Sequence, residues 1–449
     1  MLVIKIPNNN LNERKYIIDI LLGEFLGLKY KVTVDSYSDN WEIILENGNQ
    51  LIIEDHFFSK FSKDLEYLKS VNIPKKVEFS KNDFVVEDNI PIIYGIDKVT
   101  IENDSRRKKL RCGIDIFASS FFMLTRWEEY VNKKRDKHNR FPAYESLAYN
   151  NNFLDRPIVN EYLEMLWNMF KFLGCKQERK KREFELVLTH DVDVAYKYTS
   201  LLNIFREIMG DVVKRKNIKL AMNNLKNSFL NYIRIIQDPF DTYDYLMDIS
   251  EKAGVKSHFF LHSSNNAKQD INNDKYLKKI SKKILKRGHI LGYHPPYNAY
   301  NNYRLFLENK NRIENIIEKK LKIGRMHFLR FEIPTTWQIW EDANMEWDST
   351  LSYSDKEGFR CGVCYSYGVF NVLTRKKLKI KEKPLVVMEG SFTTYQPDIT
   401  PIQMEQKINK LMNKVKKYNG EFVFLWHNSS FNTFSWIKFQ NIYEKVLSK

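Results

Sequence analysis

Two aspartates, Asp191 and Asp193, stand two positions apart directly after the apolar run FELVLT (184–189). Side chains alternate between the two faces of a strand, so these carboxylates share one face and His190 points to the other. We therefore expect His190 to lie in the packing or behind a site. Two carboxylates near a histidine suit a divalent metal ion such as zinc. One carboxylate can bind the ion while the other accepts a proton from the attacking water.

Further residues that could do such chemistry stand at or near the ends of four other strand-like runs. They are His294 in HILGYH (289–294), Arg330 in MHFLRF (326–331), Glu389 in PLVVMEG (384–390) and His427 in EFVFLWH (421–427). Catalytic groups gather at the C-terminal ends of the strands in β/α barrels. Several strand ends of this kind in one half of the chain indicate a common site.

The elements that must position these residues alternate along the second part of the chain. From residue 184 onward, apolar strand-like runs alternate with amphipathic helical patterns such as 242–254 and 273–288. This alternation predicts an α/β fold with a mostly parallel sheet or a β/α barrel. The preceding residues carry helical patterns and strand-like runs of their own, which predict an N-terminal α/β domain of unknown role. The charged run CKQERKKRE (175–183) reads as the linker, so we expect domains at 1–178 and 179–449.

Residues 201–237 interrupt the alternation of strands and helices. They read as two helices that are rich in both apolar and basic residues. One interpretation is an insertion that packs on the sheet. The other is a basic, apolar surface for a membrane or a lipid-linked substrate.

The charge of the whole chain favours anionic partners. Lysine plus arginine number 72 against 56 for aspartate plus glutamate, which gives a formal net charge of +16. Such a charge suits nucleic acid, an acidic membrane surface or a phosphorylated substrate, and it also suits a solvated lysine-rich surface. The sequence contains no zinc-finger spacing and no RNA-binding aromatic motif, and the positive charges are spread along it, so nucleic acid is not the expected partner.

The N-terminus and the cysteines bear on the cellular compartment. The apolar start of MLVIKIPNNN is too short for a secretory signal, and no window holds the 18 or more uncharged apolar residues of a membrane span. Four cysteines in so long a chain do not form a disulfide framework, and CGVC (361–364) has no second pair with which to bind zinc. We expect a cytoplasmic protein, with peripheral contact at the inner face of the membrane as a further option. No pattern indicates an oligomeric state.

Residues 184–430 resemble the polysaccharide deacetylases of carbohydrate esterase family 4, the chitin-oligosaccharide deacetylase-like fold. THDVD matches the family's T-x-D-x-D strand end, and FLWH matches its late leucine-x-histidine. GYHPPYN carries the first histidine of the family's second motif, and LRFEIP carries an arginine before a proline. The N-terminal part looks like the extension of one bacterial branch of these proteins. The resemblance implies a distorted (β/α) barrel of the polysaccharide deacetylase type.

The resemblance also implies a role for each matched residue. Asp191 would be the general base, with Arg330 orienting it, and His427 would protonate the leaving amine. Asp193 and His294 would bind the divalent metal, which is zinc in this interpretation. Asn298 stands where the family has a second metal-binding histidine.

The asparagine leaves three outcomes open for the third metal ligand, because its oxygen is a poorer zinc ligand than imidazole. Asn298 could coordinate through oxygen, another residue could replace it, or the metal could be weakly bound or absent. The candidates for replacement are His190, His262, His327 and Glu389.

The expected function is metal-dependent removal of an acyl group, most simply acetyl, from nitrogen. The substrate would be an amino-sugar or glycan intermediate of cell-surface polysaccharide synthesis, in a nucleotide- or lipid-linked form. Two alternatives are a catalytically inactive glycan-binding pseudoenzyme of the same fold and a deformylase of a lipid-linked sugar.

Overall fold

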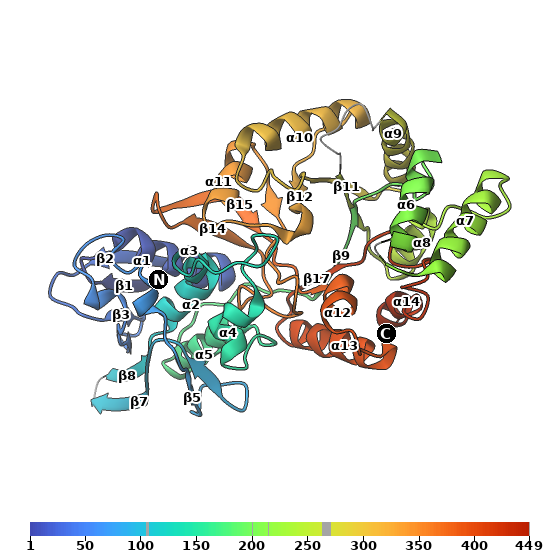
Figure 1. Cartoon of the computed structure of the whole chain (residues 1–449). Helices are drawn as coiled ribbons and strands as arrows, with labels where there is room; N and C mark the ends of the chain where they lie inside the picture. Colours follow the sequence, from blue (N-terminus) through green and yellow to red (C-terminus); the bar gives the residue numbers. More distant parts are fainter. Residues whose placement is uncertain (105–106, 200, 214, 263–270, 449) are drawn as a thin grey trace. The chain divides into compact units, whose positions relative to one another are not determined.

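The chain forms two compact units, each built from several segments. The computed structural model describes residues 1–104, 107–199, 201–213, 215–262 and 271–448 (Figure 1). Unit 1 consists of Met1–Glu185, Leu329–Val386 and Leu411–Phe422, and unit 2 of Leu186–Phe328, Val387–Lys410 and Val423–Lys449. The first segment of unit 1 ends close to the predicted boundary at 178/179. Two later segments also belong to unit 1, and no linker or charge run in the sequence marks them.

Unit 2 is built on six strands in the order β12-β11-β10-β9-β17-β16. Their bounds are β9 Glu185–Val192, β10 His258–His262, β11 Ile290–His294, β12 Ile323–Gly324, β16 Val387–Met388 and β17 Glu421–Leu425. The pairs β9–β10, β10–β11, β11–β12 and β16–β17 are parallel. The predicted mostly parallel α/β arrangement is therefore confirmed for this unit. Closure of the row of strands into a barrel stays a prediction.

Helices separate or follow the parallel strands of unit 2. They are α6 Leu201–Val213, α7 Ile218–Tyr232, α8 Tyr243–Lys252, α9 Ile271–Lys286, α10 Tyr303–Ile317, α12 Glu389–Tyr395, α13 Pro401–Lys417 and α14 Ile442–Leu447. The helices predicted at 242–254 and 273–288 correspond to α8 and α9, and the interruption at 201–237 is the helix pair α6 and α7. Apolar runs such as Phe259–Leu261 in β10 are fully buried, as expected of a parallel sheet. No helix in the described part of the chain has the length and hydrophobicity that a membrane span requires.

The strand predicted at 326–331 is wrong, and the error shifts the residues that reach the sheet edge. The strand there is β12, Ile323–Gly324, and His327–Leu329 form a short turn in which Phe328 has φ 61°. At Gly324 a Cβ atom would lie 1.9 Å from the carbonyl oxygen of Tyr293, the residue with which Gly324 pairs. Only glycine permits this close approach of β12 to β11.

Gly324→Ala is therefore expected to lower the free energy of unfolding by about 1–3 kcal/mol, the usual range for overpacking. Gly390→Ala in α12 is the matched control, because its Cβ would lie no nearer than 3.8 Å to the closest atom, in the Met388 side chain. Urea unfolding of the two variants measures the difference. Equal stabilities would show that β12 can move aside at no cost.

Unit 1 contains the remaining strands of the chain's described residues. A six-stranded sheet runs in the order β2-β1-β3-β4-β8-β7, a further pair is β5-β6, and three strands run in the order β14-β15-β13. The bounds are β1 Leu2–Ile6, β2 Tyr30–Val34, β3 Trp41–Ile44, β4 Gln50–Ile53, β5 Glu78–Ser80, β6 Ile90–Ile92, β7 Gly95–Asp104, β8 Arg107–Ile114, β13 Trp347–Asp348, β14 Tyr367–Asn371 and β15 Lys376–Glu382. The large sheet is mixed, since β1–β2 and β4–β8 are parallel and the other pairs antiparallel.

Helices and an aromatic core complete unit 1. The α-helices are α1 Leu11–Ile18, α2 Ile116–Thr125, α3 Trp127–Val131, α4 Leu147–Asn150, α5 Ile158–Phe172 and α11 Thr335–Asp342, and a π-helical stretch covers Asp19–Phe25. Trp41 stacks on Phe117, and Phe57 stacks on Trp127, all four fully or nearly fully buried. Burial of such large rings is the main source of stability in a core of this kind.

Candidate metal centre

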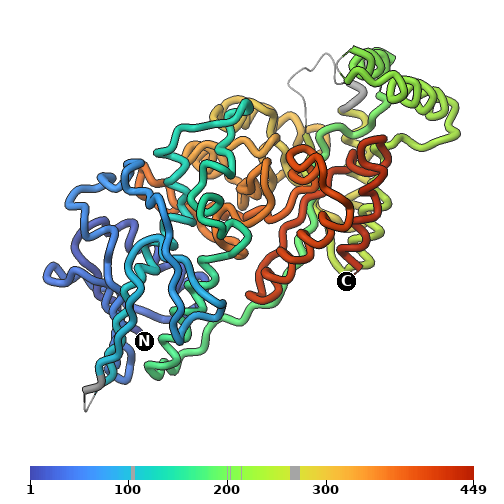
Figure 2. The backbone as a smooth tube through the Cα atoms, turned by 60° about the horizontal axis from the view of Figure 1, so that its bottom comes forward, coloured from blue at the N-terminus to red at the C-terminus, as the bar shows by residue number. Residues whose placement is uncertain are grey.

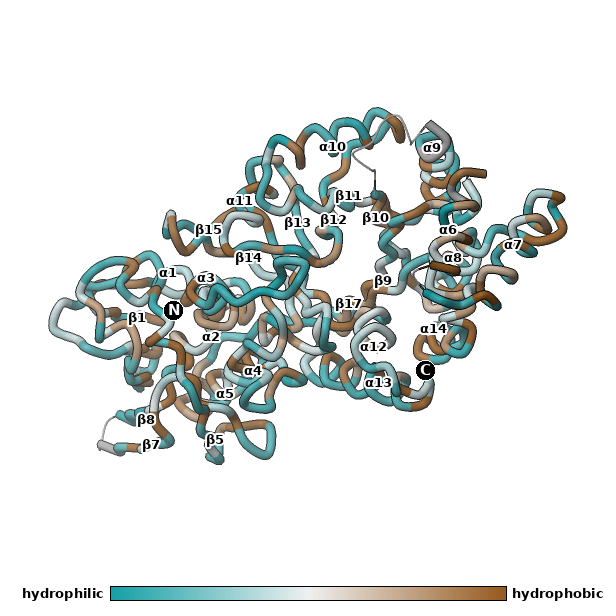
Figure 3. The backbone as a smooth tube through the Cα atoms, viewed as in Figure 1, coloured by the Kyte–Doolittle hydropathy of each residue, from teal (hydrophilic) through white to brown (hydrophobic). Residues whose placement is uncertain are grey.

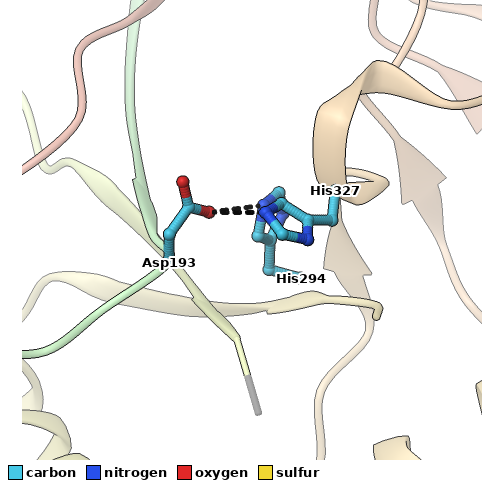
Figure 4. Close-up of side chains that lie close together, drawn as sticks. All are labelled: Asp193, His294 and His327. Atoms are coloured by element: carbon cyan, nitrogen blue, oxygen red, sulfur yellow. Dashed lines mark ion pairs between the residues drawn. The ribbon is translucent and has the colours of Figure 1, made fainter. Parts of the chain in front are cut away.

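Asp193, His294 and His327 bring three ligand atoms together at one edge of the parallel sheet of unit 2. Asp193 follows β9, His294 ends β11, and His327 follows β12. Oδ1 of Asp193 lies 3.1 Å from Nε2 of His294 and 3.4 Å from Nε2 of His327 (Figure 4). The three ligand atoms lie within 4.8 Å of one another. The Asp193 side chain is 36% exposed, so solvent reaches the cluster.

The hydrogen bonds around these side chains fit a cation. Nδ1 of His294 donates to the carbonyl of Arg325 at 2.7 Å, so in the neutral imidazole Nε2 carries a lone pair toward Asp193. Oδ1 of Asp193 is buried and accepts no hydrogen bond from a described residue. Two facing lone pairs repel each other unless a positive charge lies between them. One carboxylate and two imidazoles with an open position are the donor set of catalytic zinc sites.

The electrostatics of the cluster favour the protonation states that metal ligands need. Burial raises the pKa of Asp193, but His294, His327 and His427 together outweigh this effect and hold its pKa well below the usual range. Burial lowers the pKa of His327 to about 2, against the attraction of Asp193. The carboxylate is therefore ionised and the His327 imidazole neutral at physiological pH.

Asp191 lies beside this cluster and is held by Arg325. Its Oδ2 is 3.9 Å from Nε2 of His294, and its Oδ1 accepts a hydrogen bond from Nη1 of Arg325 at 2.8 Å. The same Nη1 donates to Oγ1 of Thr189 at 3.0 Å. All three side chains are buried, so the carboxylate is fixed in orientation. The structure thus shows Arg325 in contact with Asp191, the carboxylate that Arg330 was expected to orient, and an orienting role of Arg330 stays a prediction. Arg330 belongs to unit 1, where its Nε donates to the carbonyl of His138.

His427 lies on another side of Asp193 and is supported by Glu389. Nε2 of His427 is 3.9 Å from Oδ2 of Asp193, and its Nδ1 donates to Oε1 of Glu389 at 2.6 Å. The same oxygen accepts hydrogen bonds from the His427 backbone at 3.0 Å and from Oγ of Ser430 at 2.7 Å. Burial opposes protonation of His427, but Glu389 above all, with Asp193 and Asp191, raises its pKa to about 10.

Glu389→Gln is expected to lower the pKa of His427, because the change removes the charge that contributes most to raising it. If protonated His427 takes part in the acyl-group removal that the sequence predicts, the rate of that reaction falls as pH rises through the pKa of His427. The alkaline limb of the pH–rate profile should therefore move to lower pH in this variant. Ser430→Ala, which removes only a neutral hydrogen bond to the same carboxylate, is the control and should keep the limb in place. Coincident profiles of Glu389→Gln and wild type would show that His427 does not titrate in the reaction.

The remaining candidates for the third ligand have other places. His190 is buried, and its Nδ1 donates to the carbonyl of Trp426 at 2.7 Å, which confirms that it points away from the two aspartates. His262 ends β10, and its Nδ1 donates to the carbonyl of His294 at 3.1 Å. Glu389 supports His427. Among the His, Cys, Asp and Glu side chains of the described residues, His327 completes the possible metal-binding group, and it is one of the four replacement candidates from the sequence. Coordination by Asn298 stays a prediction.

A known protein family matches only the N-terminal part of the chain. Residues 2–174 match a family of unknown function, DUF7033. No curated protein matches the chain in sequence.

Three solved structures are similar to part of this chain at low sequence identity. A provisionally assigned polysaccharide deacetylase from Mycobacterium smegmatis is 13% identical, over 60% of this chain and 84% of that one, with a TM-score of 0.39. A pseudoenzyme of carbohydrate esterase family 4 from Bacillus anthracis is 13% identical, over 59% and 61%, with a TM-score of 0.30. A family 4 carbohydrate esterase from Streptomyces lividans, solved with acetate, is 10% identical, over 46% and 82%, with a TM-score of 0.27.

Proposed function

We propose that the protein is a metal-dependent N-deacylase that removes an acyl group, most simply acetyl, from an amino sugar. The observation that carries the proposal is the cluster of Asp193, His294 and His327 with Asp191 and His427 at its sides. The cluster supplies a metal-binding group, and its neighbours supply a separate proton acceptor and proton donor. These are the parts that hydrolysis of an amide requires.

Asp193, His294 and His327 would hold the metal ion in this proposal. A divalent ion such as zinc would supply a Lewis acid at this position and make a water molecule more acidic. Asp191 takes the proton from the water that attacks the amide carbon. Arg325 and Thr189 keep the Asp191 carboxylate in one orientation, so its free oxygen stays available as the acceptor.

His427 completes the reaction from the other side of the cluster. The carbon–nitrogen bond breaks as Nε2 of His427 gives its proton to the leaving nitrogen, and the products are a carboxylate and a free amine. Glu389 keeps Nδ1 of His427 protonated and fixes the ring, so that Nε2 is the nitrogen that faces the cluster. Asp191 and His427 thus divide the two proton transfers between them.

The proposed substrate is an amino-sugar intermediate of cell-surface glycan synthesis that carries a phosphate, as a nucleotide-linked or lipid-linked sugar. The formal net charge of +16 supports an anionic substrate over a neutral polymer. Such intermediates are assembled at the cytoplasmic face of the membrane, and we propose that the protein acts there.

The test is to incubate Zn²⁺-loaded protein with N-acetylated sugar nucleotides and with lipid-linked N-acetyl sugars, and to measure free acetate together with new primary amine. The two products should appear in equal amounts. The N-formyl forms of the same sugars test the deformylase alternative, with formate as the readout. Binding of these sugars with no release of any acyl group would identify a glycan-binding pseudoenzyme and overturn the proposal.

A further inference from the structure

The helix pair α6 and α7 exposes an unusual number of large apolar side chains. The two helices lie side by side within unit 2 (Figures 1 and 2). Hydrophobic residues recur along both of them in Figure 3. The exposed apolar residues of this hairpin, which we define as residues 201–235, are Leu201, Leu202, Phe205, Met209, Val212, Val213, Ile218, Met222, Leu225, Phe229, Tyr232, Ile233 and Ile235.

The spacing of these residues places them in one stripe on each helix. On α7 the positions 218, 222, 225, 229 and 232 follow the three- and four-residue steps of one helix face. Phe205 and Phe229 are 62% and 60% exposed, and Tyr232 is 80% exposed. In a water-soluble helix pair such a stripe faces the partner helix or the core, and here it faces outward.

The inner side of the hairpin is polar instead. Asp211 of α6 is fully buried, and its Oδ2 accepts a hydrogen bond from Nδ2 of Asn224 of α7 at 2.6 Å. Oδ1 of Asn224 accepts in turn from Nζ of Lys197 at 2.7 Å. Ser228, one turn further along α7, is also buried. The two helices are therefore held together by polar contacts, which leaves the apolar stripes free for another surface.

Basic residues border the apolar stripes. Lys219 and Lys226 each follow an apolar stripe residue by one position, and Arg206 follows Phe205 in the same way, so all three lie at the edge of a stripe. None of the three forms an ion pair with a described residue. Residues 201–237 contain seven basic and two acidic residues, and the two acidic ones, Glu207 and Asp211, pair with Arg215.

We infer that the hairpin docks on an anionic lipid surface. The apolar stripes enter the interface between headgroups and acyl chains, while Arg206, Lys219 and Lys226 extend to the lipid phosphates. The positive border is what selects this occupant, because it complements acidic lipid, and a second copy of the hairpin would bring like charges together. The inference does not depend on the proposed reaction, since no residue of the hairpin belongs to the possible metal-binding group or is Asp191 or His427.

The test is co-sedimentation of the full chain with vesicles of phosphatidylcholine alone or of an equal mixture of phosphatidylcholine and phosphatidylglycerol. Wild type should bind the mixed vesicles and bind phosphatidylcholine at least about tenfold more weakly, because each basic residue near an acidic surface contributes about a fivefold factor. Added salt should weaken the binding.

Variants separate the contribution of the apolar side chains to vesicle binding from that of the basic side chains. Phe205→Ser combined with Phe229→Ser is expected to weaken binding to mixed vesicles at least about tenfold, because two aromatic side chains that would enter the lipid on binding are lost. Lys219→Gln combined with Lys226→Gln should bring the binding close to that on neutral vesicles. The controls are Val71→Ser and Lys75→Gln with Lys76→Gln, which change exposed residues of unit 1 and should bind as wild type does.

Two results would overturn the inference. One is binding of wild type to mixed vesicles that is no stronger than to phosphatidylcholine, or that the phenylalanine variant retains. The other is a concentration-dependent dimer in light scattering that Phe205→Ser with Phe229→Ser dissolves, which would identify a second copy of the chain as the occupant.

Discussion

Replacing His327 with alanine is expected to lower the affinity of the protein for Zn²⁺ by at least about 100-fold. Even loss of a residue behind the metal ligands costs about 10- to 100-fold, and His327→Ala removes a proposed ligand itself. Asn298→Ala is expected to bind Zn²⁺ about as well as wild type. The comparison of the two variants tests whether His327 or Asn298 is the third ligand beside Asp193 and His294.

The expected difference follows from the position and the chemistry of the two side chains. Nε2 of His327 lies 3.4 Å from the Asp193 carboxylate, and burial keeps its imidazole neutral. An amide oxygen binds zinc more weakly than an imidazole nitrogen, so Asn298 would contribute little even within reach. Loss of His327 leaves Asp193 and His294, and two ligands hold zinc much less tightly than three.

Competition with a chromophoric chelator measures the affinities. His262→Ala is the matched control, because its ring centroid lies 4.5 Å from that of His327 although it is outside the possible metal-binding group. It should lose less Zn²⁺ affinity than His327→Ala, because His262 contacts the backbone of His294 and is not itself a ligand candidate in the cluster. Loss of Zn²⁺ in Asn298→Ala with retention in His327→Ala would show that the family spacing, and not the cluster seen here, defines the site.

The parts of the site that the sequence predicted share one property. Asp191, Asp193, His294 and His427 all lie at the ends of apolar runs that become strands of one sheet, and the ends of parallel strands meet at one edge of a sheet. Alternation along the strand was enough to turn His190 away from the two aspartates. Such periodic, local patterns predict the structure well because the apolar face of a strand must be buried.

The parts that the sequence did not predict depend on one glycine and one short strand. The apolar letters of MHFLRF suggested a strand that would end near Arg330, but the strand ends at Gly324, where β12 approaches Tyr293 too closely for any Cβ. Arg325, which the sequence did not single out, and His327, which it offered as one of four replacement candidates, therefore follow the strand end and enter the site. A two-residue strand gives no periodic signal, so only the close packing against β11 reveals it.

Replacing Asp191 with asparagine is expected to reduce the rate of acyl release by about 10²- to 10⁴-fold, the usual contribution of a general base. Asparagine keeps the size and shape of the side chain but cannot accept the proton of the attacking water. Zn²⁺ affinity should stay close to that of wild type, because Asp191 is not a member of the possible metal-binding group. Acetate release and chelator competition on the same preparation measure both quantities.

The two arginines test how the base is held. Arg325→Lys keeps the charge but replaces the planar guanidinium with a shorter side chain, whose ammonium group ends short of the nitrogen that contacts Asp191 and Thr189, so its kcat should fall while its KM changes little. Arg330→Lys is expected to remain close to wild type, because Arg330 contacts the carbonyl of His138 in unit 1. A large loss in Arg330→Lys alone would restore the orienting role that the family motif implies.

The pattern of losses in Asp191→Asn decides between three roles for this carboxylate. Loss of acyl release with Zn²⁺ retained identifies the base. Loss of both acyl release and Zn²⁺ binding identifies Asp191 as a fourth metal ligand. The geometry permits this role, because Oδ2 of Asp191 lies 3.9 Å from Nε2 of His294. Retention of full activity would show that another group is the base. If that group were His427, a single side chain would have to serve as base before bond cleavage and as acid after it. Its pKa of about 10 makes it a poor base at neutral pH, so this last outcome is the one that the structure opposes most directly.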